Sequence, residues 1–271
     1  MNLEEFIRLS LQEDIGEGDH TSLACIPSGS KGKAKLLIKD TGVIAGVALA
    51  ETIFKMADPS LRFNKLLDDG SIVKHGDIVF TVEGDDQSIL KTERLVLNCM
   101  QRMSGIATTT KLYVERLAGL HSRVLDTRKT TPLMRELEKW AVRIGGGLNH
   151  RMGLYDMIMI KDNHVDYAGG IIPAIKNVKS YLEKTKLLIP VEIETRNLEE
   201  VKEVLAEGGI NRIMLDNFKP QQLKAAVALI AGRYETEASG GITLDTIRSF
   251  AETGVDYISV GALTHTVKAL T

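Results

Sequence analysis

The spacing of hydrophobic and polar positions changes along the chain. Residues 1–16 have the spacing of an amphipathic helix, with acidic side chains where an export signal would carry basic ones. From 33 to about 80, short apolar runs alternate with Gly and Asp, which predicts a small mixed sheet with a helix over 48–57. From about 85 to 120 the helical spacing returns. We interpret this stretch as a helical connector, interrupted around residues 104–105.

The rest of the chain repeats an apolar strand followed by a helix. The predicted strands are residues 122–127, 156–162, 190–195, 210–216, 234–240 and 256–261. The predicted helices between them include 198–208, 221–232 and 244–254. The run MIMI is apolar at every position and RIML at every position after its first, as in parallel strands buried on both faces. Repeated βα units predict an α/β barrel or a doubly wound sheet.

Composition narrows the class of protein. The chain has 271 residues, 44% of them hydrophobic and 26% charged, which allows one large domain or two unequal ones. Its 34 Lys and Arg against 36 Asp and Glu give a formal charge of −2, which excludes a broadly basic nucleic-acid binder. The longest apolar runs are too short to span a membrane. Cys25 and Cys99 are too few for a disulfide framework and are interpreted as core residues, so we expect a cytoplasmic protein.

Polar residues follow the predicted strands. In α/β barrels the chemistry lies at the carboxyl ends of the strands. The residues at these ends are Arg128 and Lys129, Lys161, Glu194, Asp216, Ser239 with Gly240 and Gly241, and Gly261, in that order. His150 and Arg151 adjoin a further glycine-rich turn. Burying so many cations together is costly without compensating anions, which indicates a small substrate with several negative charges.

Two features of these ends suggest what the substrate carries. The turns at 239–241 and 261 lie between a strand and a helix, where backbone N–H groups favour a phosphate. Glu194 and Asp216, on adjacent strands, suit ribose hydroxyls or a hydrated magnesium ion. Taken singly, each motif is also typical of a turn or a salt bridge. Their coincidence at one end of a barrel favours function.

Several strings resemble, in order, the quinolinate phosphoribosyltransferase family. They are DTRKT (126–130), AVRIGGGLNHRMGL (141–154), IKDNH (160–164), VEIET (191–195), IMLDNF (213–218), ASGGI (238–242) and AETGVDYISVGALTH (251–265). The resemblance implies an incomplete α/β (TIM-like) barrel with a smaller N-terminal α/β sandwich. It divides the chain at 1–105, with the connector, and 106–271, the last few residues returning to the first domain.

The resemblance also implies an activity. Family members are pentosyltransferases that use magnesium to form nicotinate mononucleotide, pyrophosphate and CO2 from quinolinate and phosphoribosyl pyrophosphate, in NAD biosynthesis. They form homodimers, or higher oligomers, with a shared active site. The family often has Gly in the stretch after DTRKT, where this chain has Leu133 and Met134.

The resemblance assigns roles to individual residues. The residues implied to bind substrate are Arg94, Arg128, Lys129, His150, Arg151, Lys161, Glu194, Asp216, Ser239, Gly240, Gly241, Gly261 and His265. Arg128, His150, Arg151 and Lys161 would hold the quinolinate carboxylates, and Arg94 would come from a neighbouring subunit. The implied catalytic residues are Lys129, Lys161, Glu194 and Asp216. Lys129 would contact the pyrophosphate, and Glu194 and Asp216 the ribose and, through water and substrate, the magnesium ion. The glycine turns would hold the 5′-phosphate, with His265 at the rim.

Two alternatives remain at the level of sequence. The first is a related phosphoribosyltransferase with another acceptor, nicotinate or the substrate of a molybdenum-associated relative. A single carboxylate needs fewer cations, so the Arg and Lys set favours quinolinate. The second is a non-catalytic sensor of phosphate ligands, which would be expected to lose Lys129, Glu194 or Asp216; all three are present.

Overall fold

The computed structural model describes residues 2–271, so the predicted helical position Met1 lies outside the described residues. The chain divides into two units. The first contains the residues up to Lys111, then Thr130–Gly146 and Leu263–Thr271; the second contains Leu112–Lys129 and Gly147–Ala262. A domain boundary between residues 105 and 106 stays a prediction.

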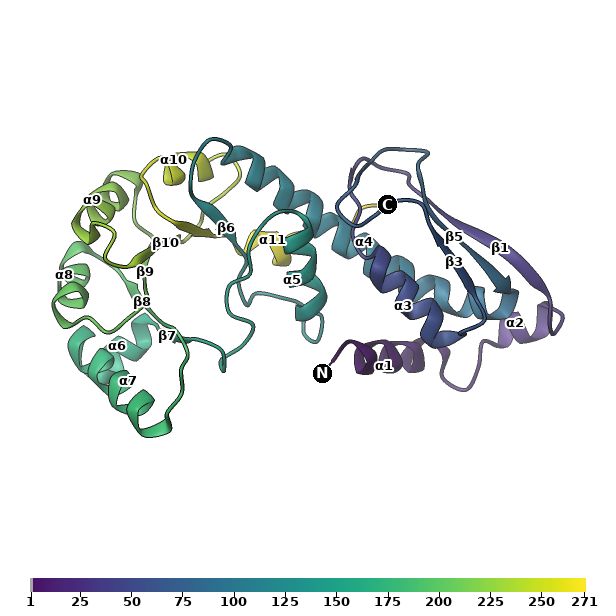
Figure 1. Cartoon of the computed structure of the whole chain (residues 1–271), viewed down its shortest axis with the longest axis horizontal. Helices are drawn as coiled ribbons and strands as arrows, with labels where there is room; N and C mark the ends of the chain where they lie inside the picture. Colours follow the sequence, from purple (N-terminus) through teal and green to yellow (C-terminus); the bar gives the residue numbers. More distant parts are fainter. Residues whose placement is uncertain (1) are drawn as a thin grey trace. The chain divides into compact units, whose positions relative to one another are not determined.

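The first unit combines antiparallel sheets with helices (Figure 1). Its helices are α1 (Leu3–Ile15), α2 (His20–Cys25), α3 (Val47–Ala57), α4 (Asp86–Arg116, up to Lys111 in this unit), α5 (Arg135–Ile144) and α11 (Ala262–His265, from Leu263). Its strands are β1 (Lys31–Leu37), β2 (Gly42–Val43), β3 (Arg62–Lys65), β4 (Ile72–Val73) and β5 (Ile78–Asp85). The sheets, β1-β5-β3 and β2-β4, are antiparallel rather than mixed. Phe54, Phe63 and Phe80 pack together at centroid distances of 4.6–6.1 Å.

The predicted interruption of the connector is wrong, because α4 continues through residues 104 and 105. The small residues there allow close packing. The Ser104 hydroxyl accepts a hydrogen bond from the Ala45 amide at 2.9 Å. A Cβ atom on Gly105 would overlap the carbonyl oxygen of Lys268. Small residues within a helix can indicate either a break in the helix or a close contact with another segment, and here they make a close contact.

The second unit is built on a parallel sheet of six strands in the order β6-β11-β10-β9-β8-β7. The strands are β6 (Arg123–Leu125), β7 (Ile158–Ile160), β8 (Val191–Thr195), β9 (Arg212–Asp216), β10 (Glu235–Ser239) and β11 (Tyr257–Ser259). Between them lie α6 (Asp162–Ala168), α7 (Ile171–Thr185), α8 (Leu198–Glu207), α9 (Pro220–Ile230) and α10 (Ile247–Ala251). Each strand falls within a predicted apolar run.

The sheet curls and carries its helices on the outer side (Figure 1). The strands β6 and β7 end the strand order without pairing with each other, so the barrel is incomplete, as expected. All five residues of β8 are buried, which agrees with a strand covered on both faces. The curled sheet therefore has an inner face, onto which every second residue of a strand projects.

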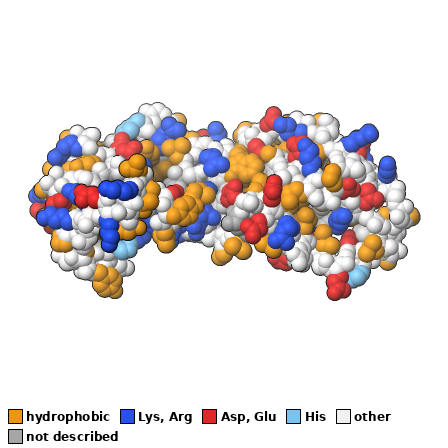
Figure 2. Space-filling view, turned by 60° about the horizontal axis from the view of Figure 1, so that its bottom comes forward, with side chains coloured by type: hydrophobic (Ala, Val, Ile, Leu, Met, Phe, Trp, Pro, Cys, Tyr) orange, Lys and Arg blue, Asp and Glu red, His pale blue; other side chains and the backbone are white. Residues whose placement is uncertain are grey.

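Surface properties agree in part with the sequence. Figure 2 shows Lys and Arg side chains interspersed with Asp and Glu side chains on the face displayed, as the near-zero net charge suggests. Within residues 2–271, no helix combines the length and hydrophobicity that a membrane span needs. Cys99 is buried, but Cys25 is exposed at the end of α2, so its interpretation as a core residue is wrong.

Candidate active site

The carboxyl ends of neighbouring strands bring Lys161, Glu194 and Asp216 together. The Lys161 ammonium lies 3.4 Å from Glu194 Oε2. Burial raises the pKa of Glu194; Lys161 opposes this, and the charge of Asp216 adds to it. A cation and two carboxylates at one strand edge suit a ligand with hydroxyl and anionic groups.

The loops before β7 supply more cations. Burial lowers the pKa of Arg151, and the nearby positive charge of Arg128 lowers it further. The Arg151 guanidinium donates to the carbonyl of Met157 at 3.1 Å. Neighbouring guanidinium groups repel each other unless an anion lies between them. The second unit thus brings Arg128 and Arg151 close together, as predicted.

His150 is more deeply placed than the sequence suggested. His150 is only 7% exposed. Its Nε2 lies 2.9 Å from Glu192 Oε2 and 3.4 Å from Glu237 Oε2. Its backbone amide donates to the buried carboxylate of Asp126 at 2.8 Å, which ties the loop after Leu148 to the end of β6. Burial disfavours the charged ring, whereas the two glutamates favour it and raise the pKa of His150.

The turn after β10 contains the two glycines predicted to bind phosphate. Gly240 has φ 102° and Gly241 φ 60°, in the left-handed region that favours glycine. A Cβ atom on Gly240 would overlap the Asn217 side chain, and the Asn217 amide donates to the Ser239 carbonyl at 2.9 Å. Asp216 and Ser239 are register partners, which brings the turn beside the carboxylate. Gly261 lies two residues after the end of β11.

The remaining predicted residues lie elsewhere or at the surface. Lys129 is exposed, and its backbone amide donates to the Thr127 hydroxyl at 3.1 Å. Arg94 is exposed on α4, and His265 ends α11; both belong to the first unit. The contribution of Arg94 from a neighbouring subunit and the place of His265 at the rim stay predictions.

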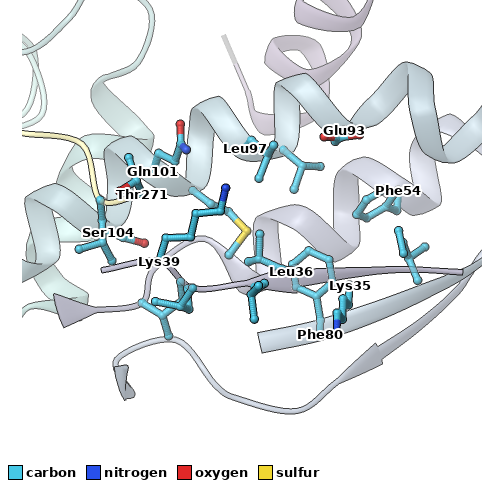
Figure 3. Close-up of a pocket in the computed structure, with 18 of the residues that line it drawn as sticks. Lys35, Leu36, Lys39, Phe54, Phe80, Glu93, Leu97, Gln101, Ser104 and Thr271 are labelled. Carbon is cyan, nitrogen blue, oxygen red and sulfur yellow. The ribbon is translucent and has the colours of Figure 1, made fainter. Parts of the chain in front are cut away.

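A large cavity also occurs in the first unit, and none of the residues predicted to bind substrate lines it. It measures about 490 Å³ and is lined mainly by apolar side chains of β1, β5, α3 and α4. Figure 3 shows Leu36, Phe54, Phe80 and Leu97 around it, with Lys39 and Gln101 among its polar residues. It offers little of the charge that a polyanionic substrate requires, so we place the active site at the strand ends.

Comparison with known proteins identifies the chain. The model of the quinolinate phosphoribosyl transferase C-terminal domain matches residues 106–271, and that of the N-terminal domain matches residues 19–104. The chain belongs to the quinolinate phosphoribosyltransferase family. The family assignment made from the sequence motifs is confirmed.

Relatives and solved structures agree. A rice protein named nicotinate-nucleotide pyrophosphorylase (carboxylating), chloroplastic, is 51% identical and covers 99% of this chain and 76% of its own length. A tobacco protein named quinolinate phosphoribosyltransferase (decarboxylating) 2b, mitochondrial, is 50% identical, with 99% and 80% covered. The crystal structure of NadC from Streptococcus pyogenes matches with a TM-score of 0.94 at 38% identity, covering 99% of this chain and 94% of that one. The expected fold of an incomplete barrel with a smaller N-terminal domain is confirmed.

The expectation of a cytoplasmic protein is wrong. The plant relatives at 50–51% identity are named chloroplastic or mitochondrial. Composition and a low cysteine content reflect the redox conditions a chain tolerates, and organelles share such conditions with the cytoplasm. They do not identify the compartment.

The sequence reading missed the buried charges inside the sheet. Glu192, Arg212 and Glu237 lie within β8, β9 and β10, and both glutamates are fully buried. A signal was available: charged residues at alternate positions of the otherwise buried strands VEIET and ETEAS point toward one face. These residues lie inside the strands and not at their ends, where the candidate site residues were sought.

Proposed function

We propose that this chain transfers the phosphoribosyl group of phosphoribosyl pyrophosphate to quinolinate with decarboxylation, a step of NAD biosynthesis. The products are nicotinate mononucleotide, pyrophosphate and CO2. Family membership supports the reaction. The observation that carries it is the grouping of Arg128 and Arg151, together with Lys161, at the carboxyl ends of the strands, since quinolinate brings two carboxylates.

The first step is a displacement at the anomeric carbon of the ribose. The ring nitrogen of quinolinate forms a bond to C1′ as the bond from C1′ to the pyrophosphate oxygen breaks, through a loose, oxocarbenium-like transition state. Arg128, Arg151 and Lys161 hold the quinolinate carboxylates, and Lys129 lies against the departing pyrophosphate. Positioning and charge neutralisation supply most of the acceleration, and no covalent enzyme intermediate is needed.

The second step removes the carboxylate next to the ring nitrogen. The bond between C2 and this carboxylate breaks, CO2 leaves, and the electron pair stays on C2, where the quaternised ring nitrogen stabilises it. A proton from solvent then completes the product. The protein contributes by keeping the substrate carboxylates fixed while the charge develops.

The carboxylates at the strand ends suit magnesium bound with substrate. Glu194 and Asp216 are neighbours, and magnesium prefers a few carboxylates together with water and substrate phosphates. These residues would hold the ion, mostly through water and substrate, and the ion would neutralise the pyrophosphate as it leaves. The turn at 239–241 with Gly261 would hold the 5′-phosphate.

Assembly completes the proposed site. We infer a homodimer in which Arg94 of one subunit reaches the strand ends of its partner, with His265 at the rim. Arg94 is exposed on α4, and Leu90, one helical turn earlier, is 44% exposed. An apolar side chain beside a cation on one helix face is typical of a surface that another subunit covers.

Titration calorimetry on Arg128→Ala and Arg151→Ala tests the carboxylate assignment. Each change removes a charge-assisted contact of about 2 kcal/mol, so quinolinate should bind about 30-fold more weakly while phosphoribosyl pyrophosphate binds as before. Arg233→Ala, exposed after α9, is the matched control. Equal losses for both ligands would show that these arginines do not hold quinolinate.

Release of labelled CO2 tests the reaction itself. Wild-type protein should release CO2 from carboxyl-labelled quinolinate only when phosphoribosyl pyrophosphate is present. Nicotinate serves as the competing acceptor, since its single carboxylate needs fewer cations. Consumption of nicotinate without CO2 release from quinolinate would contradict the proposal.

A further inference from the structure

A cluster of charged side chains, most of them buried, lies on the inner face of the sheet, two residues before the proposed site along β8 and β10. It consists of His150, Glu192, Arg212 and Glu237, which we call the inner cluster. Glu192 lies two residues before Glu194, and Glu237 two residues before Ser239, so these side chains project to the same face of their strands. The inner cluster therefore supports the residues at the strand ends.

The contacts of the inner cluster are specific. Arg212 Nη1 lies 3.0 Å from Glu237 Oε2, and its Nη2 lies 2.9 Å from Glu235 Oε2. The same guanidinium stacks 4.1 Å from the centre of the Tyr257 ring. Arg212 thus places a positive charge near the two fully buried carboxylates of the cluster, Glu192 and Glu237. Removing ions from water costs free energy, and well-packed apolar residues in their place would give the fold at least the same stability. Stability alone therefore does not explain these charged residues.

The hydrogen bonds of His150 show what this cluster does. The backbone amide of Arg151 donates to His150 Nδ1 at 2.7 Å, so Nδ1 must carry a lone pair. The two glutamates raise the pKa of His150 and so favour a second ring proton, but that proton would lie on Nδ1, directly against the amide hydrogen of Arg151. The geometry therefore favours the singly protonated ring. The ring proton therefore lies on Nε2, which faces the Glu192 and Glu237 carboxylates at 2.9 and 3.4 Å. Each ring nitrogen thus faces a group of the protein, Nδ1 the Arg151 amide and Nε2 the two carboxylates.

These contacts change the role expected of His150. Its ring nitrogens face Arg151 and the two glutamates, so we expect His150 to act on quinolinate through Arg151 rather than to hold a carboxylate itself. Its effect passes through the main chain of Arg151, whose guanidinium is held in turn by the Met157 carbonyl. A fixed backbone at residue 151 limits where that guanidinium can lie.

We propose that Glu192, Glu237 and Arg212 are positioning residues for quinolinate binding, which keep the proton of His150 on Nε2 and so fix the main chain of Arg151 through Nδ1. This inference rests on the proposed function only for the identity of the ligand.

A divalent cation is the other arrangement that this chemistry allows. Ligand atoms of His150, Glu192 and Glu237 lie within 4.8 Å of one another. Against it, Nε2 and Glu192 Oε2 are at hydrogen-bond distance, and Arg212 already brings a positive charge to Glu237. We therefore favour the proton, and the test includes the metal as an outcome.

The first measurement is nitrogen NMR of the wild-type protein labelled with ¹⁵N-histidine, with His150→Gln used to assign the signals. We expect His150 to show a protonated Nε2 and an unprotonated Nδ1 at neutral pH. A proton on Nδ1, or a metal-bound Nε2 that chelation reverses, would overturn the proposal. This readout needs no turnover, so it stands apart from the CO2 assay, whose failure would instead reject the proposed reaction.

The second measurement compares Glu192→Leu with Glu192→Gln. Leucine removes the acceptor for the Nε2 proton, so KM for quinolinate should rise between about 10- and 100-fold, as expected for a misplaced binding group, with KM for phosphoribosyl pyrophosphate unchanged. Glutamine retains an acceptor oxygen and should restore most of the affinity. Glu203→Gln, exposed on α8, should change neither constant. Equal effects of Leu and Gln, or equal losses for both substrates, would indicate a merely structural role.

Discussion

At the scale of single residues, Leu133 has an unfavourable backbone conformation. Its φ is 65°, and its side chain is 74% exposed, so little packing compensates the left-handed backbone. Such a conformation costs a bulky residue about 1 kcal/mol or more. Leu133→Gly should therefore raise the free energy of unfolding by about 0.5 kcal/mol in urea titrations, after the greater freedom of the unfolded chain is subtracted.

Leu188→Gly is the matched control for this change. Leu188 is fully exposed in an irregular segment and has no positive φ. There glycine relieves no strain and only loosens the unfolded chain, so stability should fall slightly. If both variants lost stability alike, the strain at Leu133 would be absent in solution.

Glu194 couples stability to pH at the proposed site. Burial is the main cause of its raised pKa, so the folded chain keeps the proton at pH values where the unfolded chain has lost it. The folded state then binds more protons, and its stability falls as pH rises from the ordinary glutamate pKa through the raised one. Glu194→Gln removes this loss and should be more stable than wild type at pH 7, by about 1 kcal/mol or less, yet nearly inactive.

Thermal unfolding at pH 4 and pH 7 checks this expectation. The advantage of Glu194→Gln should shrink at pH 4, where the carboxyl group is protonated in both states. Glu203→Gln, exposed on α8, should leave activity unchanged. A Gln variant less stable than wild type at pH 7 would show that the contact with Lys161 outweighs burial.

At the scale of elements, an ion pair joins α4 to α5. Arg102 Nε donates to Glu138 Oε1 at 2.7 Å, and Glu138 is fully buried. Arg102 also donates to the Thr264 carbonyl at 3.1 Å, before the end of α11. Arg102→Met leaves a buried carboxylate without its cation, so the free energy of unfolding should fall by about 3 kcal/mol in denaturant titrations.

The double variant Arg102→Met with Glu138→Gln separates charge from packing. It should regain part of the loss, because no buried charge is left uncompensated. Lys55→Met, which breaks the exposed pair between Lys55 and Glu51 on α3, should cost less than about 1 kcal/mol. A loss at Arg102 as small as that at Lys55 would mean that the α4–α5 pair is open in solution.

At the scale of the whole molecule, the proposed shared site predicts complementation. Arg94→Ala and Arg128→Ala should each lose most activity alone, because each removes a cation from every site. When the two are mixed and exchange subunits, half of the dimers are mixed and each contains one intact site. The mixture should therefore regain about a quarter of wild-type activity.

Two controls make the mixing experiment decisive. Differently tagged Arg128→Ala subunits establish that exchange occurs and should show no recovery. With exchange demonstrated, a mixture of Arg94→Ala and Arg128→Ala that stayed inactive would mean that Arg94 and Arg128 serve the same subunit, and the shared site would be rejected.

Most helices and strands could be predicted from the local spacing of apolar and polar residues. The strands β8 and β9 were predictable because VEIE carries its apolar side chains at alternate positions and RIML has three apolar residues in a row, and such spacing depends only on neighbours in sequence. Gly105 was misread for the same reason: a small residue in a helix has the same local signature whether it breaks the helix or admits the Lys268 carbonyl.

The sequence by itself determined the βα rhythm, the family and the set of polar residues that follow the strands, because each depends on short spacings or motifs. Only the tertiary structure decided that His150 faces Glu192 and Glu237 and that its Nδ1 holds the Arg151 amide. Those partners come from three separate stretches of chain. Their distance, burial and hydrogen-bond direction arise only when the sheet curls, and these determine whether a histidine binds substrate or positions a neighbour.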